Sequence, residues 1–183
     1  MMGRISRFML LSFSLGLFTA CGSTEVDPGV TVGGNGAPVS AAAVFEPRPG
    51  AEIAGTAKFI ETEEGVLVAA VLSGLPPGKH GIHLHEKGEC VGPDFASAGE
   101  HFNPTNQPHA CPPDTKRHAG DLGNIEVDAD GTGRFELKTD LLTVDPGATS
   151  VVGRAVIIHD MADDCVSQPS GGAGVRLGCA VVK

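Results

Sequence analysis

The sequence predicts an all-β fold, a sandwich or flattened barrel of about eight short strands. The chain contains 26 glycines and 13 prolines in 183 residues, which interrupt it at short intervals. Between these interruptions apolar and polar residues alternate, as they do in half-buried strands, and we find no convincing helix and no repeat. The length fits one domain with a short appendage.

The individual strands are bounded by turn residues. The clearest is 133–139, where Phe135 and Leu137 are expected to point inward while the charged residues between them point outward. Turns are expected at 47–50, 63–65, 76–78 and 128–131. The strands are expected at 39–45, 53–62, 66–72, around 81–86, and at 123–127, 133–139, 153–159 and 175–182.

The first 38 residues are expected to lie outside the folded domain, which we place at residues 39–183. Residues 1–20 combine Arg4 and Arg7 with the apolar run 8–18, which is too short to span a membrane and typical of a signal peptide. Residues 21–38 are rich in Gly, Ser and Thr and predict a flexible tether.

The residues around Cys21 resemble a bacterial lipoprotein signal, in which this cysteine becomes the lipidated N-terminus. The simpler alternative is cleavage near Ala20 with a free or paired Cys21. Either way the chain is expected to be exported, to the periplasm or the cell surface. Membrane contact is expected only in the lipidated form, through its anchor. The formal net charge of −9 argues against nucleic-acid binding, which needs a basic face.

Histidine is the most informative residue type. His83 and His85 are two residues apart, so in a strand both imidazoles lie on one face while Ile82 and Leu84 lie on the other. Imidazole suits copper and zinc, and a carboxylate is also an acceptable zinc ligand. Further candidate ligands are His101, His109, His118, Asp121 and His159.

Two four-coordinate metal ions require eight ligand positions, and these residues supply seven groups. One imidazole would therefore serve both metals. His101 is the natural candidate, because it lies in sequence between the His83/His85 pair and the later group. Such an imidazole must lose both ring protons, which two flanking cations make easy.

The spacing of these residues resembles the copper/zinc superoxide dismutases over residues 39–183, essentially the whole domain. Several motifs occur in the family order, so a chance similarity is excluded in practice. The motifs are Gly81-x-His83-x-His85-Glu86, Ser97-Ala98-Gly99-Glu100-His101-Phe102-Asn103-Pro104, His118-Ala119-Gly120-Asp121-Leu122-Gly123-Asn124 and Gly174-x-Arg176-x-Gly178-Cys179.

The resemblance implies an eight-stranded, immunoglobulin-like Greek-key barrel with two long functional loops. It implies an enzyme that converts superoxide to dioxygen and hydrogen peroxide by cycling copper between Cu(II) and Cu(I), beside a structural zinc. Carried over by position, the copper ligands are His83, His85, His101 and His159. The zinc ligands are His101, His109, His118 and Asp121, with His101 as the bridge.

The resemblance also assigns two residues outside the ligand set. Asp163 matches a carboxylate that joins a copper-ligand histidine, here His83 or His85, to the zinc ligand His109. Arg176 matches the arginine that attracts the superoxide anion beside copper. The loop after His159 lacks guiding lysines, so Lys87, Lys116 or Arg117 are candidates for steering the anion.

Cysteine usage fits an oxidising compartment. Without Cys21 four cysteines remain, which allow three pairings. The resemblance pairs Cys90 with Cys179. Cys111 and Cys165 each lie two residues after a partner of the implied Asp163–His109 contact, so we predict a second disulfide between them; two free thiols are the alternative.

Two other functions stay open. One is a copper-binding or copper-delivery module on this fold, and the other is a structural zinc domain with an incidental copper site. The retention of His83, His85, His159 and Arg176 argues against both. Members of the family are often dimers through different surfaces, so a homodimer is one arrangement that the sequence leaves open.

Overall fold

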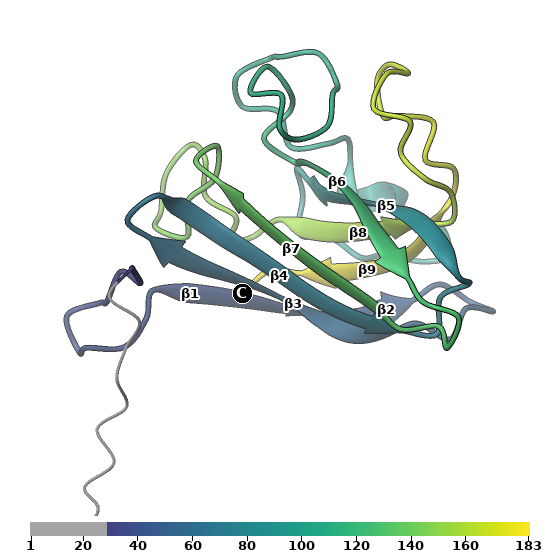
Figure 1. Cartoon of the computed structure of the whole chain (residues 1–183), viewed down its shortest axis with the longest axis horizontal. Coiled ribbons are helices and arrows are strands. Elements are labelled where there is room, and N and C mark those ends of the chain that lie inside the picture. Colours follow the sequence, from purple (N-terminus) through teal and green to yellow (C-terminus); the bar gives the residue numbers. More distant parts are fainter. Residues whose placement is uncertain (1–28) are drawn as a thin grey trace, which may run out of the picture.

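The computed structural model describes residues 29–183, so the expected signal peptide and residues 21–28 lie outside the described residues. The regular secondary structure of the described chain is almost entirely β (Figure 1). Its elements are β1 (Ser40–Val44), β2 (Glu46–Pro47), β3 (Ala54–Thr62), β4 (Gly65–Ser73), β5 (Gly78–His85), the 3-10 helix η1 (Ala96–Ala98), β6 (Asp121–Val127), β7 (Gly133–Thr139), β8 (Ala155–His159) and β9 (Arg176–Val181).

The strands form one antiparallel sheet in the order β1-β3-β4-β7-β6-β5-β8-β9-β2. Strands β5, β6 and β7 follow one another as neighbours, and β8 returns to lie beside β5. This order is a Greek key. The all-β barrel predicted from the sequence is therefore confirmed, including its connectivity.

The described residues contain one strand more than the eight that we expected, namely β2. We had assigned Pro47 to a turn, and a two-residue strand gives no periodic signal in the sequence. Residues 40–47 change partners at Phe45: β1 pairs with β3, whereas β2 pairs with β9. This change of partner joins the two ends of the sheet, so the sheet is nearly closed into a barrel.

A second contact reinforces this seam. The backbone N–H of Ala42 donates to the carbonyl of Lys183, and the N–H of Lys183 donates back to Ala42, both at 2.9 Å. The strand edges along the seam are thereby paired rather than left open to other chains.

The described part of the expected tether is attached to the barrel. Val30 bridges to Thr62, and the Thr31 N–H donates to the Glu61 carbonyl at 3.0 Å. Residues 29–31 thus pair with the end of β3, and Gly33 bonds to Ala37 within the same segment. The bonds are backbone bonds with a distant strand, which composition does not reveal. Among residues 29–183 no helix is long and apolar enough to cross a membrane.

Strand β5 separates the core from the candidate site. Ile82 and Leu84 are fully buried in the main hydrophobic core, together with Phe59, Ile125 and Ile158. The expected alternation is confirmed, because His83 and His85 project from the opposite face, where loops cover them.

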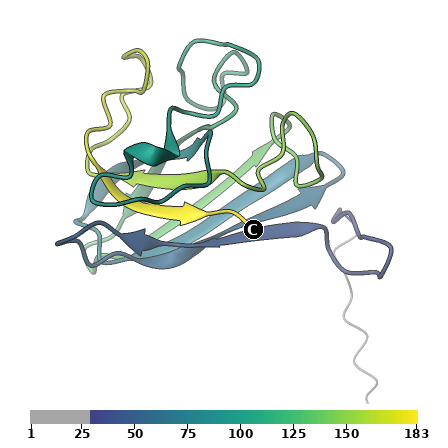
Figure 2. The ribbon, with the colours of Figure 1, turned by 180° about the vertical axis from the view of Figure 1, so that it is seen from behind.

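Two long loops, residues 86–120 and 160–175, project from the same side of the barrel near β5, β6 and β8 (Figures 1 and 2). The first loop returns to β5 and continues the sheet, because Phe102 N–H donates to Leu84 C=O at 2.8 Å and Leu84 N–H donates to Gly120 C=O at 2.9 Å. A Cβ at Gly120 would lie 2.1 Å from the Leu84 carbonyl oxygen. Only glycine permits this close approach, which brings both ends of the loop onto the histidine-bearing strand.

Candidate metal centre

Four histidines from three parts of the fold meet on the outer face of β5. His83 and His85 come from β5 itself, His159 ends β8, and His101 lies in the first loop, bridged to His85 by its backbone. One ring nitrogen from each lies within 4.8 Å of the other three, and all four residues are buried. We call these residues the first group.

The outer nitrogens of the first group are held by the protein. His83 Nε2 contacts Asp163 Oδ2 at 2.8 Å, His85 Nδ1 contacts the Gly99 carbonyl at 2.9 Å, and His159 Nδ1 contacts the Gly174 carbonyl at 3.2 Å. Each acceptor fixes the orientation and the tautomer of its ring, since the bonded nitrogen must carry the proton.

The inner nitrogens have no hydrogen-bond partner. These atoms are His83 Nδ1 and the Nε2 atoms of His85, His101 and His159, and all are buried. A buried polar atom without a partner is costly, and four of them facing one another would be unusual in a site built only for stability. A soft or borderline metal ion bound by four imidazoles accounts for all four at once.

The second group consists of His101, His109, His118 and Asp121, whose ligand atoms also lie within 4.8 Å of one another. Asp121 Oδ1 lies 2.7, 3.0 and 3.1 Å from the Nδ1 atoms of His101, His109 and His118. The His109 approach lacks hydrogen-bond geometry, because His109 Nδ1 has no hydrogen-bond partner. Ligands about 2.0 Å from one tetrahedral ion are roughly 3.3 Å apart, so these distances fit a zinc-sized ion.

His101 belongs to both groups. Its Nδ1 faces Asp121 in the second group, and its unpartnered Nε2 faces the first group. The ring centroid of His101 lies 4.0 Å from that of His83 and 5.6 Å from that of His118. The two candidate sites are therefore adjacent and share this one imidazole.

Burial keeps the imidazoles of His83, His85 and His159 neutral. It lowers the pKa of His83 to about 4, against the opposing hydrogen bond with Asp163. It also lowers the pKa of His159 to about 3, assisted by the charge of His83, and it places the pKa of His85 well below its usual range. Neutral imidazoles present the lone pairs that a metal requires.

The second group has the opposite electrostatic character, because it contains a carboxylate. Burial raises the pKa of Asp121, but the contacts with His101 and His109 outweigh burial and hold that pKa well below its usual range. Asp121 is thus anionic at neutral pH. Burial lowers the pKa of His109, but Asp121 and Asp163 outweigh it and raise that pKa to about 9.

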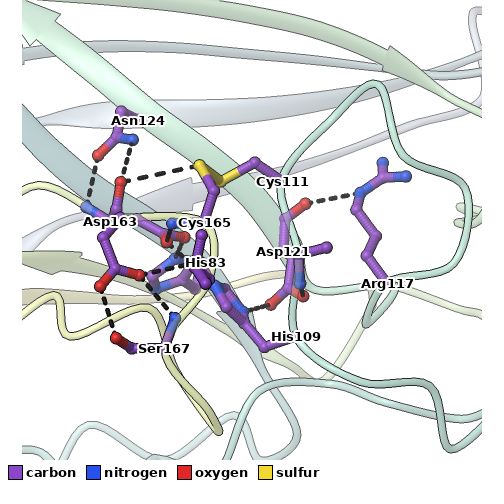
Figure 3. The surroundings of a disulfide bond; sticks show 12 residues. His83, His109, Cys111, Arg117, Asp121, Asn124, Asp163, Cys165 and Ser167 are labelled. Atoms are coloured by element: carbon purple, nitrogen blue, oxygen red, sulfur yellow. Dashed lines mark hydrogen bonds and ion pairs between the residues drawn. A yellow bond between two sulfur atoms is a disulfide. The ribbon is translucent and has the colours of Figure 1, made fainter.

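Asp163 joins the two groups as expected. Its Oδ2 contacts His83 Nε2, and its Oδ1 contacts His109 Nε2 at 3.0 Å (Figure 3). The sequence left open whether the first partner was His83 or His85, and the structure selects His83. Burial raises the pKa of Asp163, but the bonds with His109 and His83 hold it well below its usual range, so Asp163 is ionised.

Comparisons with known proteins agree on one family. A family model described as copper/zinc superoxide dismutase matches residues 53–182. A protein named superoxide dismutase [Cu-Zn] 5, from Dictyostelium discoideum, is 39% identical over 128 residues, which are 67% of this chain and 83% of that protein. This chain belongs to the copper/zinc superoxide dismutase family. It is therefore an oxidoreductase of the superoxide dismutase class whose metals are copper and zinc.

Solved structures give the same picture. The clock protein EA4 superposes with a TM-score of 0.72 at 38% identity, covering 79% of this chain and 94% of that one. A double mutant of a SOD-like protein from Bacillus subtilis gives 0.69 at 38% identity, covering 76% and 94%. The fold is thus shared with a protein described as SOD-like and with one described as a clock protein.

Arg176 of this dismutase-family chain lies beside the first group. Its Nη1 donates to the Phe95 carbonyl and its Nη2 to the Gly99 carbonyl, both at 2.7 Å. The Gly99 carbonyl also accepts from His85 Nδ1, so one backbone oxygen holds both the arginine and a first-group histidine. Burial lowers the pKa of Arg176, while the charges of Glu100 and Asp94 oppose this.

Both predicted disulfides are present. Cys90 pairs with Cys179, which attaches the first loop to β9 in a small second core with Phe95 and Ile157. Cys111 pairs with Cys165, which joins the first loop to the second. Two disulfides indicate an extracellular or periplasmic protein.

Arg117 is not free to steer an anion. It is 4% exposed, and its guanidinium donates to the carbonyls of Asp121 and Asp114 and to Thr139 Oγ1. The expectation of a guiding role for Arg117 is therefore wrong, because this side chain supports the backbone of the second group. Lys87 Nζ lies 3.9 Å from Glu86 Oε1 in an exposed pair, which partly offsets its charge.

Two side chains that sequence reasoning missed also support the site. Asn124 pairs with the backbone of Asp163, and Gln168 pairs with the backbone of His109. Asn124 lies within a family motif and could have been singled out. Gln168 carries no signal in the sequence, because its partner is 59 residues away.

Proposed function

We propose that this protein dismutates superoxide by copper cycling, with copper held by the first group and zinc by the second. His83, His85, His101 and His159 would hold copper. His101, His109, His118 and Asp121 would hold zinc, and His101 would bridge the two ions.

One observation carries the assignment of the first group to copper. Each of its four histidines directs one buried, unpartnered nitrogen toward the others, whereas the outer nitrogens of His83, His85 and His159 are already bonded. An all-imidazole ligand set suits copper, and a set that includes a carboxylate suits zinc. The shared His101 leaves the second group no open position for a catalytic water, which argues against hydrolysis.

Bound copper would supply a one-electron couple, by which one superoxide is oxidised to dioxygen and a second, with two protons, is reduced to hydrogen peroxide. The guanidinium of Arg176 attracts and hydrogen-bonds the anion. His101 is held at Nδ1 by Asp121, so its Nε2 is the ring atom at which it can hold a proton and pass it to the product. Asp163 keeps His83 and His109 in their required orientations.

The test is superoxide dismutation by the purified protein, measured together with its copper and zinc content. We expect near-stoichiometric copper and zinc, fast dismutation, and loss of activity when copper alone is removed and return of activity when it is restored. Full metal loading without activity would instead favour a copper-binding or delivery role. Zinc without copper would favour a structural zinc domain.

We also propose export of the chain as a lipoprotein anchored through Cys21, with residues 1–20 removed. The two disulfides support an oxidising compartment, and the signal itself lies outside the described residues. Mass spectrometry of the processed N-terminus is the test, and an unmodified Cys21 would contradict lipidation.

We propose a homodimer as the oligomeric state to be tested. The support is the family membership of the chain alone. Sedimentation of the purified protein over a range of concentrations would show it, and a monomer at all concentrations would contradict it.

A further inference from the structure

The second loop holds the backbone of a proposed zinc ligand through one side-chain amide. Gln168 Oε1 accepts from the His109 N–H at 2.8 Å, and Gln168 Nε2 donates to the His109 carbonyl at 2.8 Å. The amide thus pairs with both polar groups of one residue, as a neighbouring strand would. Such a pair fixes the position and the direction of the His109 backbone.

A second amide holds the partner of His109 in the same way. Asn124 Oδ1 accepts from the Asp163 N–H at 2.8 Å, and Asn124 Nδ2 donates to the Asp163 carbonyl at 2.9 Å (Figure 3). The hydrogen bond between Asp163 Oδ1 and His109 Nε2 therefore has a fixed backbone on both sides.

The second loop also closes tightly over this hydrogen bond. A Cβ at Gly171 would lie 1.9 Å from Asp163 Oδ1 and 2.7 Å from His109 Nε2, and Gly171 has a φ of +68°. The Gly171 N–H donates to the Ser167 carbonyl at 2.7 Å, so the turn that carries Gln168 is closed by its own backbone. This turn therefore packs directly against the hydrogen bond between His109 and Asp163.

The Cys111–Cys165 disulfide cannot do this alone. It joins the two loops at residues two positions beyond His109 and Asp163, and the dihedrals of Ala110 and His109 remain between the disulfide and the imidazole. Gln168 acts on His109 itself.

We infer that Gln168 is a positioning residue for His109, which orients the imidazole so that Nδ1 faces Asp121 before any metal binds. The inference rests on the proposed zinc site. It assigns part of the construction of that site to the second loop, which contributes no zinc ligand of its own.

Substitution of Gln168 tests this in the purified full-length protein. Gln168→Leu removes both hydrogen bonds, whereas Gln168→Glu keeps an acceptor for the His109 N–H but loses the donor to its carbonyl. Gln107→Leu is the matched control, since Gln107 lies on the first loop and its side-chain nitrogen bonds only to the Thr105 carbonyl. The readouts are the rate of zinc release to a chelator and the visible absorption of Co²⁺ placed in the zinc site.

We expect zinc release about tenfold faster in Gln168→Leu, an intermediate rate in Gln168→Glu, and a rate in Gln107→Leu equal to that of the unsubstituted protein. The Co²⁺ bands, which report ligand geometry, should change in the same order. Unchanged release and unchanged bands in both Gln168 variants would overturn the inference. If the unsubstituted protein gives no tetrahedral Co²⁺ spectrum, the zinc assignment fails instead, so the two failures are distinct. If Gln168→Leu does not fold, Gln168→Glu alone decides.

Discussion

At the scale of single residues, the centre depends on which nitrogen of each imidazole is already bonded. A backbone carbonyl or a carboxylate takes one ring nitrogen of His83, His85 and His159 and so leaves the other for a metal. Because these acceptors belong to the protein, the tautomers are set in the folded chain and do not depend on the metal.

Asp163 is the carboxylate that acts on both groups, so its charge should affect the affinity of both metals. Asp163→Asn keeps the shape but removes the charge and one acceptor. We expect copper and zinc affinities to fall about 10- to 100-fold, measured by competition with chelators. Asp164→Asn is the control, because the carboxylate of Asp164 is exposed and bonds within its own turn to Val166 and Ser167. Equal affinities in the two variants would contradict this role.

The raised pKa of His109, about 9, predicts how zinc binding depends on pH. Below that pH the metal-free imidazole is protonated, and zinc must displace the proton. Zinc affinity should therefore rise about tenfold per pH unit from pH 7 towards pH 9 and then level off. Proton release on zinc addition, followed with a pH indicator, measures this directly. An affinity that is flat over this range would contradict the raised pKa.

The same shift has a consequence for the metal-free fold. A raised pKa means that protonated His109 stabilises the folded state. This stabilisation is complete below pH 6.5, which is about the pKa of a histidine in the unfolded chain. It is lost as the pH rises through about 9, the pKa of His109 in the folded chain.

At the scale of elements, the parts predicted from the sequence are those with a local pattern. The alternation of Ile82, His83, Leu84 and His85 defines β5 and its two faces, and the structure bears it out. The pairing of Cys111 with Cys165 followed from the implied contact between Asp163 and His109, and it is present. Both cases required only short spacings and the family motifs.

The parts that were missed depend on partners distant in the sequence. Strand β2 exists because β9 passes beside it, and residues 29–31 pair with the end of β3. Arg117 looked like a free cation but lies within hydrogen-bonding distance of Thr139. No periodicity or composition encodes such contacts, so the sequence alone could not place them.

The Cys111–Cys165 disulfide connects the first loop to the second, and its removal should destabilise the fold. Replacement of both cysteines by serine should lower the free energy of unfolding by about 2–4 kcal/mol, because the unfolded chain is no longer cross-linked. Chemical denaturation of the metal-free oxidised protein measures this. Coincident unfolding curves for the variant and the unsubstituted protein would show that the bond does not stabilise the fold.

At the scale of the whole molecule, the negative net charge of the chain opposes the approach of its proposed substrate. The chain carries a formal net charge of −9, yet the proposed substrate is an anion. A cavity of about 300 Å³ that reaches His101 and His118 is lined by Glu86 and Glu100 and by no cation. A second cavity of about 310 Å³ is lined by Arg176 and Arg48 with a single acid, Asp94. We therefore expect an anion to be repelled at the first cavity and attracted at the second.

This asymmetry predicts that removing an acid should accelerate the enzyme. Glu100 acts on the charge of Arg176 and lines the cavity over His101. Glu100→Gln should raise kcat/KM about two- to fivefold at low ionic strength, with the gain fading as salt screens the charge. Rapid-mixing assays over a range of salt concentrations would show it, with Glu136→Gln on the distant strand β7 as the charge-matched control. If kcat/KM rises equally in both variants, the effect comes from the net charge of the protein and not from the position of Glu100 at the cavity.

The Gly99 carbonyl accepts hydrogen bonds from both Arg176 and His85, so a spectroscopic label at this one group would report on the centre. Any anion that draws the guanidinium away must weaken one of the two bonds to this single oxygen. A carbon-13 label at that carbonyl would thus give one vibrational band that reports substrate-side and metal-side events together. The Gly99 carbonyl of the first loop thus connects Arg176, which would attract the anion, with His85, which would bind copper.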